Sequence, residues 1–265
     1  KPDFLAGRNK FSAGPVAGNI SNQGALTTAS GGQVFLVAPN VENNGIITAP
    51  NGDVVLAAGR QVQLVDSRDP DLHVVVSAPD DKAVNLGQVI SQGGRIGIYG
   101  ALVNQRGAVN ANSAVVGVNG KIVLKASGDA LLEAGSTTTA TGAGNGGNVH
   151  VLGNRVGMTG NASIDVSGAT GGGTVLMGGD YRGGNPLYAS AQQTIMGKDA
   201  SIKADATFAG KGGKVILWAT GAMRAFGSIS ARGGDTSGNG GFIETSAAYL
   251  DVNGLRIDAG ALNGA

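Results

Sequence analysis

One short pattern recurs along the whole chain: a glycine, any residue, Val or Ile, any residue, and then usually a large aliphatic side chain. Eight copies begin at the glycines Gly32, Gly52, Gly94, Gly120, Gly147, Gly173, Gly213 and Gly241. Successive copies are 20, 42, 26, 27, 26, 40 and 28 residues apart. A period of this length is typical of arrays in which each repeat buries its apolar face against the next one. The two spacings near double length each contain either a degenerate turn or an excursion.

Two further strand-like patterns lie between these copies. The first covers residues 45–49, 163–166, 201–204, 228–231 and 256–259, and a weaker one covers residues 41–44, 102–104 and 250–253. Apolar and polar residues alternate in both, which is the periodicity of a strand. Gly and Asn stand at the junctions and tolerate the positive φ of tight corners. Each repeat therefore predicts three short strands.

Three strands per repeat favour an all-β, right-handed parallel β-helix over other architectures. A sandwich or antiparallel barrel needs hairpins, whose turn signals are almost absent here, and a propeller blade needs four strands. We expect residues 1–265 to form one β-helix segment with excursions near 66–86 and 180–198. Eight to ten turns, stacked about 4.8 Å apart, give a rod on the order of 40–50 Å long. The second residue after each glycine is expected to point inward: Val34, Val54, Ile96, Ile122, Val149, Val175, Val215 and Ile243.

Composition agrees with this fold and excludes several classes of protein. Glycine occurs 48 times with only 7 prolines, hydrophobic residues make up 42% and charged residues 14%, which excludes collagen and argues against disorder. The net charge is +1 without a basic run, so nucleic acid is an unexpected partner. No apolar stretch approaches the roughly 18 residues of a membrane-spanning helix. The chain begins Lys-Pro-Asp-Phe, without an initiator methionine or signal peptide, and we expect it to be part of a longer protein.

Several strings resemble the filamentous haemagglutinin family, the secreted partners of two-partner secretion systems. They begin with Phe-Leu-Ala-Gly at residues 4–7, Phe-Ser-Ala-Gly at 11–14, Gly-Gly-Gln-Val-Phe-Leu-Val-Ala-Pro at 31–39 and Val-Val-Leu-Ala-Ala-Gly at 54–59. Further strings, at residues 162–168, 171–180, 212–219, 226–231 and 238–246, resemble the shaft-proximal region of that family. The resemblance covers nearly the whole chain, although the Asn-Pro-Asn-Gly string of the family's secretion motif does not occur in it.

The resemblance implies a right-handed parallel β-helix, export through an outer-membrane transporter, and a location outside the cell or on its surface. It also implies adhesive, haem-acquiring or contact-toxin roles. We therefore expect a structural, adhesive segment of a surface or biofilm-matrix adhesin, with a host surface or matrix carbohydrate as its ligand. Two alternatives stay open: a polysaccharide lyase or hydrolase, and the stalk of a toxin-delivery or haem-acquisition exoprotein.

Candidate site residues are few, and we expect no catalytic, cofactor or metal site. Aromatic rings can stack on sugars, which makes Trp218, Tyr181 and Tyr188 the candidate ligand residues. The glycine-rich residues 142–147 have dinucleotide-fingerprint spacing, but a strand is expected after them where a helix is required. An enzyme would most readily use the acidic cluster, which comprises Asp66, Asp69, Asp71, Asp80 and Asp81.

The outward side of the repeated strands also makes a prediction. The third residue after each repeat glycine reads Phe35, Val55, Gly97, Val123, His150, Leu176, Ile216 and Glu244. Five of these eight are large and apolar, and an exposed stripe of that kind is larger than soluble monomers usually tolerate. We expect at least one of the two excursions to fold back over this face.

Overall fold

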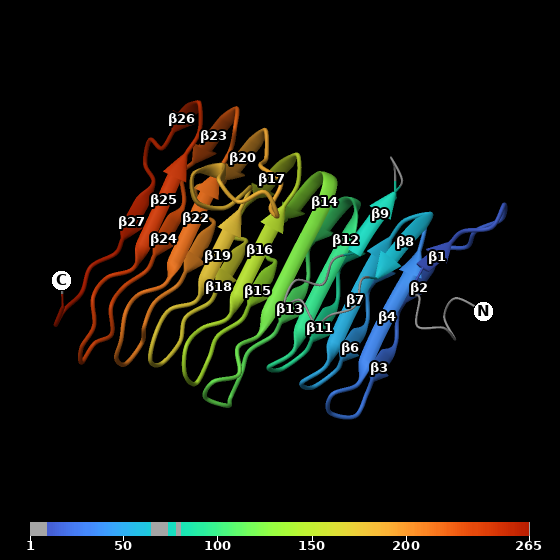
Figure 1. Cartoon of the computed structure of the whole chain (residues 1–265), viewed down its shortest axis with the longest axis horizontal. Coiled ribbons are helices and arrows are strands. Elements are labelled where there is room, and N and C mark those ends of the chain that lie inside the picture. Colours follow the sequence, from blue (N-terminus) through green and yellow to red (C-terminus); the bar gives the residue numbers. More distant parts are fainter. Residues whose placement is uncertain (1–9, 65–73, 78–80, 265) are drawn as a thin grey trace.

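The chain forms a rod in which the backbone winds repeatedly around one long axis (Figure 1). The computed structural model describes residues 10–64, 74–77 and 81–264. Strands of successive turns pair in parallel and in register, so the right-handed parallel β-helix expected from the sequence is confirmed. Each turn has three strands, which stack along the rod as face 1, face 2 and face 3.

Every repeat glycine directly precedes a strand of face 1. Face 1 consists of β4 (Gln33–Ala38), β7 (Asp53–Ala58), the first halves of β12 (Arg95–Gln105) and β14 (Lys121–Leu132), β16 (Asn148–Leu152), β19 (Thr174–Met177), β22 (Lys214–Trp218) and β25 (Phe242–Ser246). Face 2 consists of β2 (Ile20–Asn22), β5 (Val41–Asn43), β10 (Lys82–Asn85), the second halves of β12 and β14, β17 (Arg155–Met158), β20 (Gln193–Met196), β23 (Ala222–Ala225) and β26 (Tyr249–Asp251).

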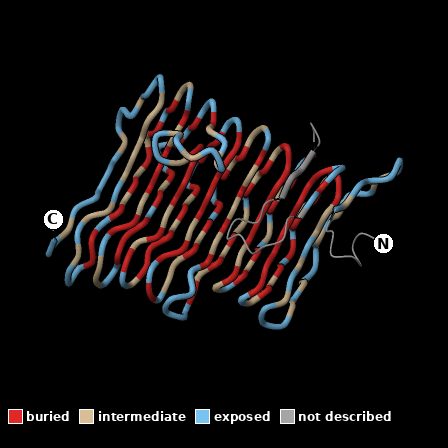
Figure 2. The backbone as a smooth tube through the Cα atoms, viewed as in Figure 1, coloured by how far each residue is buried: buried red, intermediate tan, exposed pale blue. Residues whose placement is uncertain are grey.

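Face 3 carries the second strand-like pattern of the sequence. It consists of β3 (Ala25–Thr27), β6 (Ile46–Thr48), β11 (Gln88–Ile90), β13 (Ala108–Asn110), β15 (Thr137–Thr139), β18 (Ser163–Asp165), β21 (Ser201–Lys203), β24 (Ser228–Ser230) and β27 (Arg256–Asp258). The core is the space enclosed by the three faces. Figure 2 shows buried residues running through the middle turns, with exposed residues at the corner loops and the two ends.

The inward column on face 1 is the one expected from the sequence. Ile96 pairs with Val54 on one side and with Ile122 on the other, and Ile122 pairs with Val149. All four are at most 1% exposed.

One further column, at the corner of faces 2 and 3, is polar in the early turns and apolar later. It begins with Asn22, Asn43, Asn85 and Gln105, and each of the three asparagines donates its side-chain amide to the side-chain oxygen of the next residue at 2.7–2.9 Å.

The repeat glycines are required for a steric reason, and the positive φ expected at the corners occurs directly before them, at Gly31, Asn51 and Gly93. None of the eight repeat glycines has a positive φ. A Cβ on Gly52 would lie 1.9 Å from the carbonyl oxygen of Gly32, and one on Gly94 would lie 2.1 Å from that of Gly52. Consecutive turns touch backbone to backbone at this corner, which leaves no space for a side chain.

The corner between faces 2 and 3 tests this steric argument with a matched pair. A Cβ on Gly87 would lie 2.1 Å from the Gly45 carbonyl oxygen, whereas Gly24, at the same corner of the first turn, has nothing within 4 Å. We expect Gly87→Ala to lower the free energy of unfolding by about 2–3 kcal/mol, as overpacking does, and Gly24→Ala to change it little. Chemical denaturation measures both; equal effects would contradict the close approach.

Both long repeats contain an excursion and no additional turn. Each excursion leaves between face 1 and face 2, after β7 and after β19. The first contains β8 (Gln61–Leu64) and β9 (Val74–Ser77), which form an antiparallel sheet with β1 (Lys10–Ser12). The second contains a short 3₁₀ helix, η1 (Tyr181–Gly183). The excursions are shorter than expected. Two segments inside the ranges expected for them, Lys82–Asn85 and Gln193–Met196, belong to the β-helix itself as strands β10 and β20.

Candidate functional site: the covered face and the polar groove

The extra-helical sheet covers the outer side of face 1 in the N-terminal half of the rod. Val55, Ala57 and Tyr99 point outward from face 1 and form a second apolar cluster with Val62 of β8, all at most 2% exposed. Phe11 of β1 packs against this cluster. The covering expected from the outward apolar stripe is therefore confirmed here.

Residues 178–192 cover the same face four turns further along. His150, Leu176 and Ile216 lie beneath them and are at most 5% exposed. The Tyr188 ring meets the His150 ring edge-on, with centroids 5.0 Å apart. Asp180 accepts a hydrogen bond from Lys214 Nζ at 2.9 Å, which fastens this loop to β22. Most of the stripe is thus covered, by a different element in each half of the rod, whereas Phe35 at its N-terminal end is 37% exposed.

The loop closes over Trp218 because two glycines carry no side chain. A Cβ on Gly179 would lie 2.7 Å from the indole ring, and one on Gly183 would lie 2.8 Å from it. Both glycines also have a positive φ, of 150° and 62°, which side chains rarely adopt. Trp218 Nε1 is buried and has no hydrogen-bond partner among the described residues. The loop therefore packs directly on the indole ring of Trp218.

The structure brings all three candidate ligand residues to this one loop. Trp218 and Tyr188 are partly buried and pack beneath or within it, whereas Tyr181 is 41% exposed. The Tyr181 ring packs edge-on against Phe242, with centroids 5.6 Å apart, and the Arg182 guanidinium lies 4.9 Å from its centre. Sugar binding by these residues stays a prediction.

Among the described residues beneath the loop, His150 is the one titratable group with a strongly perturbed pKa. Burial lowers the pKa of its imidazole to about 4, and the nearby Lys121 and Lys214 lower it further, while Asp180 opposes them. Its Nδ1 is buried without a hydrogen-bond partner among the described residues. The imidazole is therefore neutral at pH 7, because the excursion buries it although it lies on the outward side of its strand.

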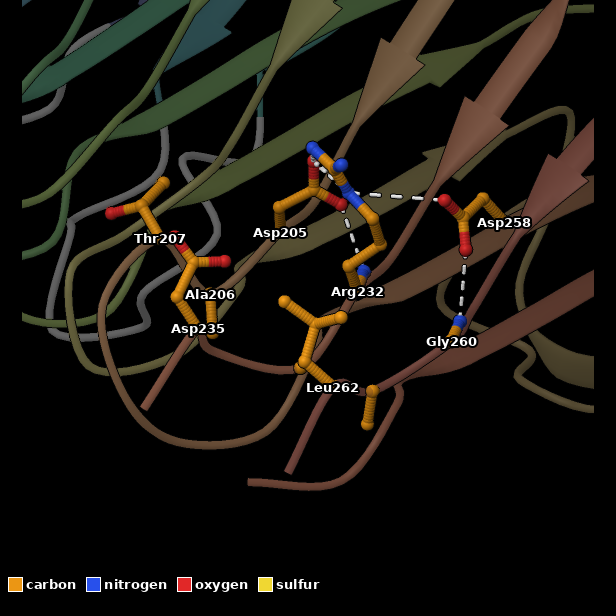
Figure 3. Close-up of a pocket in the computed structure, with 10 residues that line it drawn as sticks. Asp205, Ala206, Thr207, Arg232, Asp235, Asp258, Gly260 and Leu262 are labelled. Atoms are coloured by element: carbon orange, nitrogen blue, oxygen red, sulfur yellow. Dashed lines mark hydrogen bonds and ion pairs between the residues drawn. The ribbon is translucent and has the colours of Figure 1, made fainter. Parts of the chain in front are cut away.

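A polar groove lies at the corner between faces 3 and 1 in the C-terminal half (Figure 3). It consists of two adjoining hollows of about 500 and 330 Å³, which share Asp205, Thr207 and Arg232. The larger extends to Asp235 and Asp258, and the smaller to Thr141. We refer to the lining of both hollows as the corner groove.

Arg232 is held in the corner groove by Asp205, one turn away. Asp205 is 4% exposed, and its carboxylate accepts bonds from Arg232 Nη2 at 3.0 Å and from the Arg232 backbone N–H at 2.8 Å. Ser230 Oγ donates to it at 2.9 Å. Asp258 lies 4.0 Å from Arg232 Nε and accepts a bond from the Gly260 N–H. The guanidinium, about half exposed, is thus fixed and faces solvent.

Sequence reasoning did not single out this groove. Asp205 and Arg232 each follow a copy of the second strand-like pattern directly, as Ser167 does one turn earlier. Aligning the copies of this pattern on one another places Ser167, Asp205 and Arg232 at equivalent positions of successive turns, whereas a search for clusters along the sequence does not.

The other motifs carry no site. Asp66, Asp69, Asp71 and Asp80 lie outside the described residues. Asp81 is buried, and its Oδ2 has no partner among the described residues. Residues 142–147 form a corner that leads into strand β16, as expected. The described residues contain no group of three potential metal ligands, and no described helix could span a membrane.

A solved structure matches the whole chain. The HMW1 secretion domain from Haemophilus influenzae superposes with a TM-score of 0.87 at 30% sequence identity, covering 100% of this chain and 72% of that chain. The chain belongs to this family, the secretion domains of two-partner secretion exoproteins. It is therefore a segment of a secreted protein. No family model and no curated protein matches the chain.

Proposed function

We propose that the chain is the export-directing, rod-forming segment of an adhesin of the filamentous haemagglutinin type. In this proposal an outer-membrane transporter recognises the secretion domain, and the folded rod then holds an adhesive surface outside the cell. The observation that carries the proposal is the 30% identity to the HMW1 secretion domain over the full length of the chain.

The architecture supports export followed by folding. Each strand pairs with its counterpart one turn away, so every turn can add to the one already formed without a distant partner. The chain has no cysteine, so folding needs no oxidation step. Such a chain can cross the outer membrane unfolded and wind up progressively on the far side.

We also propose that the rod is not an enzyme. In the corner groove the buried Asp205 is already hydrogen-bonded to Arg232 and Ser230, so its carboxylate is held by neighbouring side chains and is not presented to a substrate. The stalk of a toxin-delivery or haem-acquisition exoprotein remains the alternative, because such a stalk would share this fold.

Export is tested by fusing the chain to a reporter enzyme and measuring where the enzyme activity appears. The chain, placed between a cleavable signal peptide and a β-lactamase, is expressed with and without the outer-membrane transporter of the same secretion system. We expect lactamase activity in the medium only when the transporter is present. Activity that stays in the periplasm in its presence, or reaches the medium without it, would contradict the proposal.

A further inference from the structure

We infer that the corner groove binds an extended, uncharged β-1,4-linked glycan, with about one sugar unit for each turn of the rod. This adds a ligand site to the exported rod and does not depend on how the chain crosses the outer membrane. The inference rests on three features of the groove: its length, its repeat and its chemistry.

The groove is long enough for an oligosaccharide. Its two hollows adjoin, since Asp205, Thr207 and Arg232 line both. Its lining comes from successive turns that lie in parallel register at this corner, as the bridges from Gly142 to Gly168 and from Gly168 to Ala206 show. The residues in equivalent positions are Thr141, Ser167, Asp205, Arg232 and Gly260.

The repeat of the groove matches a sugar chain. Successive turns present polar groups about 4.8 Å apart, the spacing of neighbouring strands. One pyranose unit of an extended β-1,4-linked glycan has a similar length, so successive sugars can lie over successive turns. Neighbouring sugars are rotated by half a turn, so alternate sugars present the same edge to the groove. An extended peptide advances about 3.3 Å per residue and would lose this match after one or two residues.

The charges of the groove favour an uncharged ligand. Four carboxylates, those of Asp165, Asp205, Asp235 and Asp258, stand against only two cationic side chains. These two are Lys203 and Arg232. The excess of negative charge disfavours uronates, sulfated sugars and nucleic acid by like-charge repulsion.

The groups that remain are suited to sugar hydroxyls. Hydroxyls, carboxylates and the Arg232 guanidinium offer donors and acceptors, while Ala261 and the 79% exposed Leu262 offer apolar contact to a ring face. Arg232 is already fixed by Asp205, so binding orders no further long side chain there.

Isothermal titration of the purified chain with cellopentaose and with the pentamer of N-acetylglucosamine tests the inference. We expect saturable binding of at least one pentamer, and affinity at least about tenfold lower for its dimer, since the dimer occupies fewer turns. No saturable binding of either pentamer would overturn the inference, as would tighter binding of pentagalacturonate or of an extended pentapeptide.

A matched pair of variants locates the site. Arg232→Ala removes the exposed cation of the groove, whereas Arg155→Ala removes an arginine of similar exposure that pairs with Asp129 on face 2. We expect Arg232→Ala to lower affinity about tenfold or more, the effect of losing a charged hydrogen bond, and Arg155→Ala to leave it unchanged. Asp258→Asn, which keeps the side-chain volume, provides a second groove variant if Arg232→Ala loses its circular dichroism spectrum. Equal affinities for all variants would place the glycan elsewhere.

Discussion

An aspartate in place of Ile122 is expected to abolish cooperative folding of the rod at room temperature. Ile122 is fully buried and lies between Ile96 and Val149 on the adjacent turns. Neither neighbour offers a hydrogen-bond donor from its side chain, so the new carboxylate has no partner in the core. The lost aliphatic packing and the unpaired polar group together cost on the order of 5 kcal/mol or more. That is comparable with the whole stability of many domains.

The control is the same substitution at an outward position. Ile195 on β20 is 45% exposed, so Ile195→Asp keeps its carboxylate in water and should shift the thermal midpoint by only a few degrees. Circular dichroism melting curves of both variants decide the matter. An unchanged midpoint for Ile122→Asp would show that the inward and outward sides of face 1 have been assigned the wrong way round.

The inward columns could be predicted from sequence because they depend on local information. A glycine followed by alternating residues fixes which side chains of one strand share a face, and Val54, Ile96 and Ile122 follow from that rule without knowledge of their neighbours. The reason for the glycines could not be predicted in this way. The contact of Gly94 with the Gly52 carbonyl depends on the distance between two turns, which the sequence does not specify.

Contacts that depend on the register of strands on either side of an excursion were harder to predict from the sequence. Asn43 and Asn85 bind each other in the core although 42 residues separate them, because the first excursion is looped out between them. Sequence patterning treated such residues as corner residues. Asp205 and Arg232 lie on consecutive turns without an excursion between them, yet their pairing too becomes visible only when the strands before them are aligned.

For the covered face, the sequence predicts that a cover exists but not which residues form it. Outward apolar residues such as Leu176 and Ile216 predict that something must cover them, and the structure confirms a cover. Which residues provide it was not encoded in any local pattern. Trp218 was expected among ligand-binding aromatics, but its packing depends on Gly179 and Gly183, whose positions over the indole emerge only once the loop has folded back.

Acidification from pH 7 to pH 4 is expected to loosen the loop over His150 before the rod itself unfolds. The folded structure lowers the pKa of His150 from an ordinary value near 6.5 to about 4, mainly by burial. The fold therefore favours the neutral imidazole. Its contribution is complete above pH 6.5 and declines as the pH falls towards 4, by at most about 3 kcal/mol. Opening the loop to hydrate the charged ring requires far less disruption than unfolding the β-helix.

The carboxylate that fastens the loop responds at lower pH. Burial acts to raise the pKa of Asp180, but hydrogen bonds from Asn185 and Lys214 outweigh it, so the net direction is downward. The ion pair with Lys214 therefore persists at a pH where His150 is already gaining its proton.

Trp218 reports the opening directly, because it is the only tryptophan of the sequence and lies beneath the same loop. We expect its emission to shift to longer wavelength as the pH falls from 6.5 to 4, while the far-ultraviolet circular dichroism of the β-helix stays constant. His150→Phe keeps an aromatic ring against Tyr188 but cannot be protonated, so its emission should be independent of pH in this range. His73→Phe removes the only other histidine and should leave the transition intact. A transition that survives in both single variants, His150→Phe and His73→Phe, would assign the acid response to the carboxylates instead.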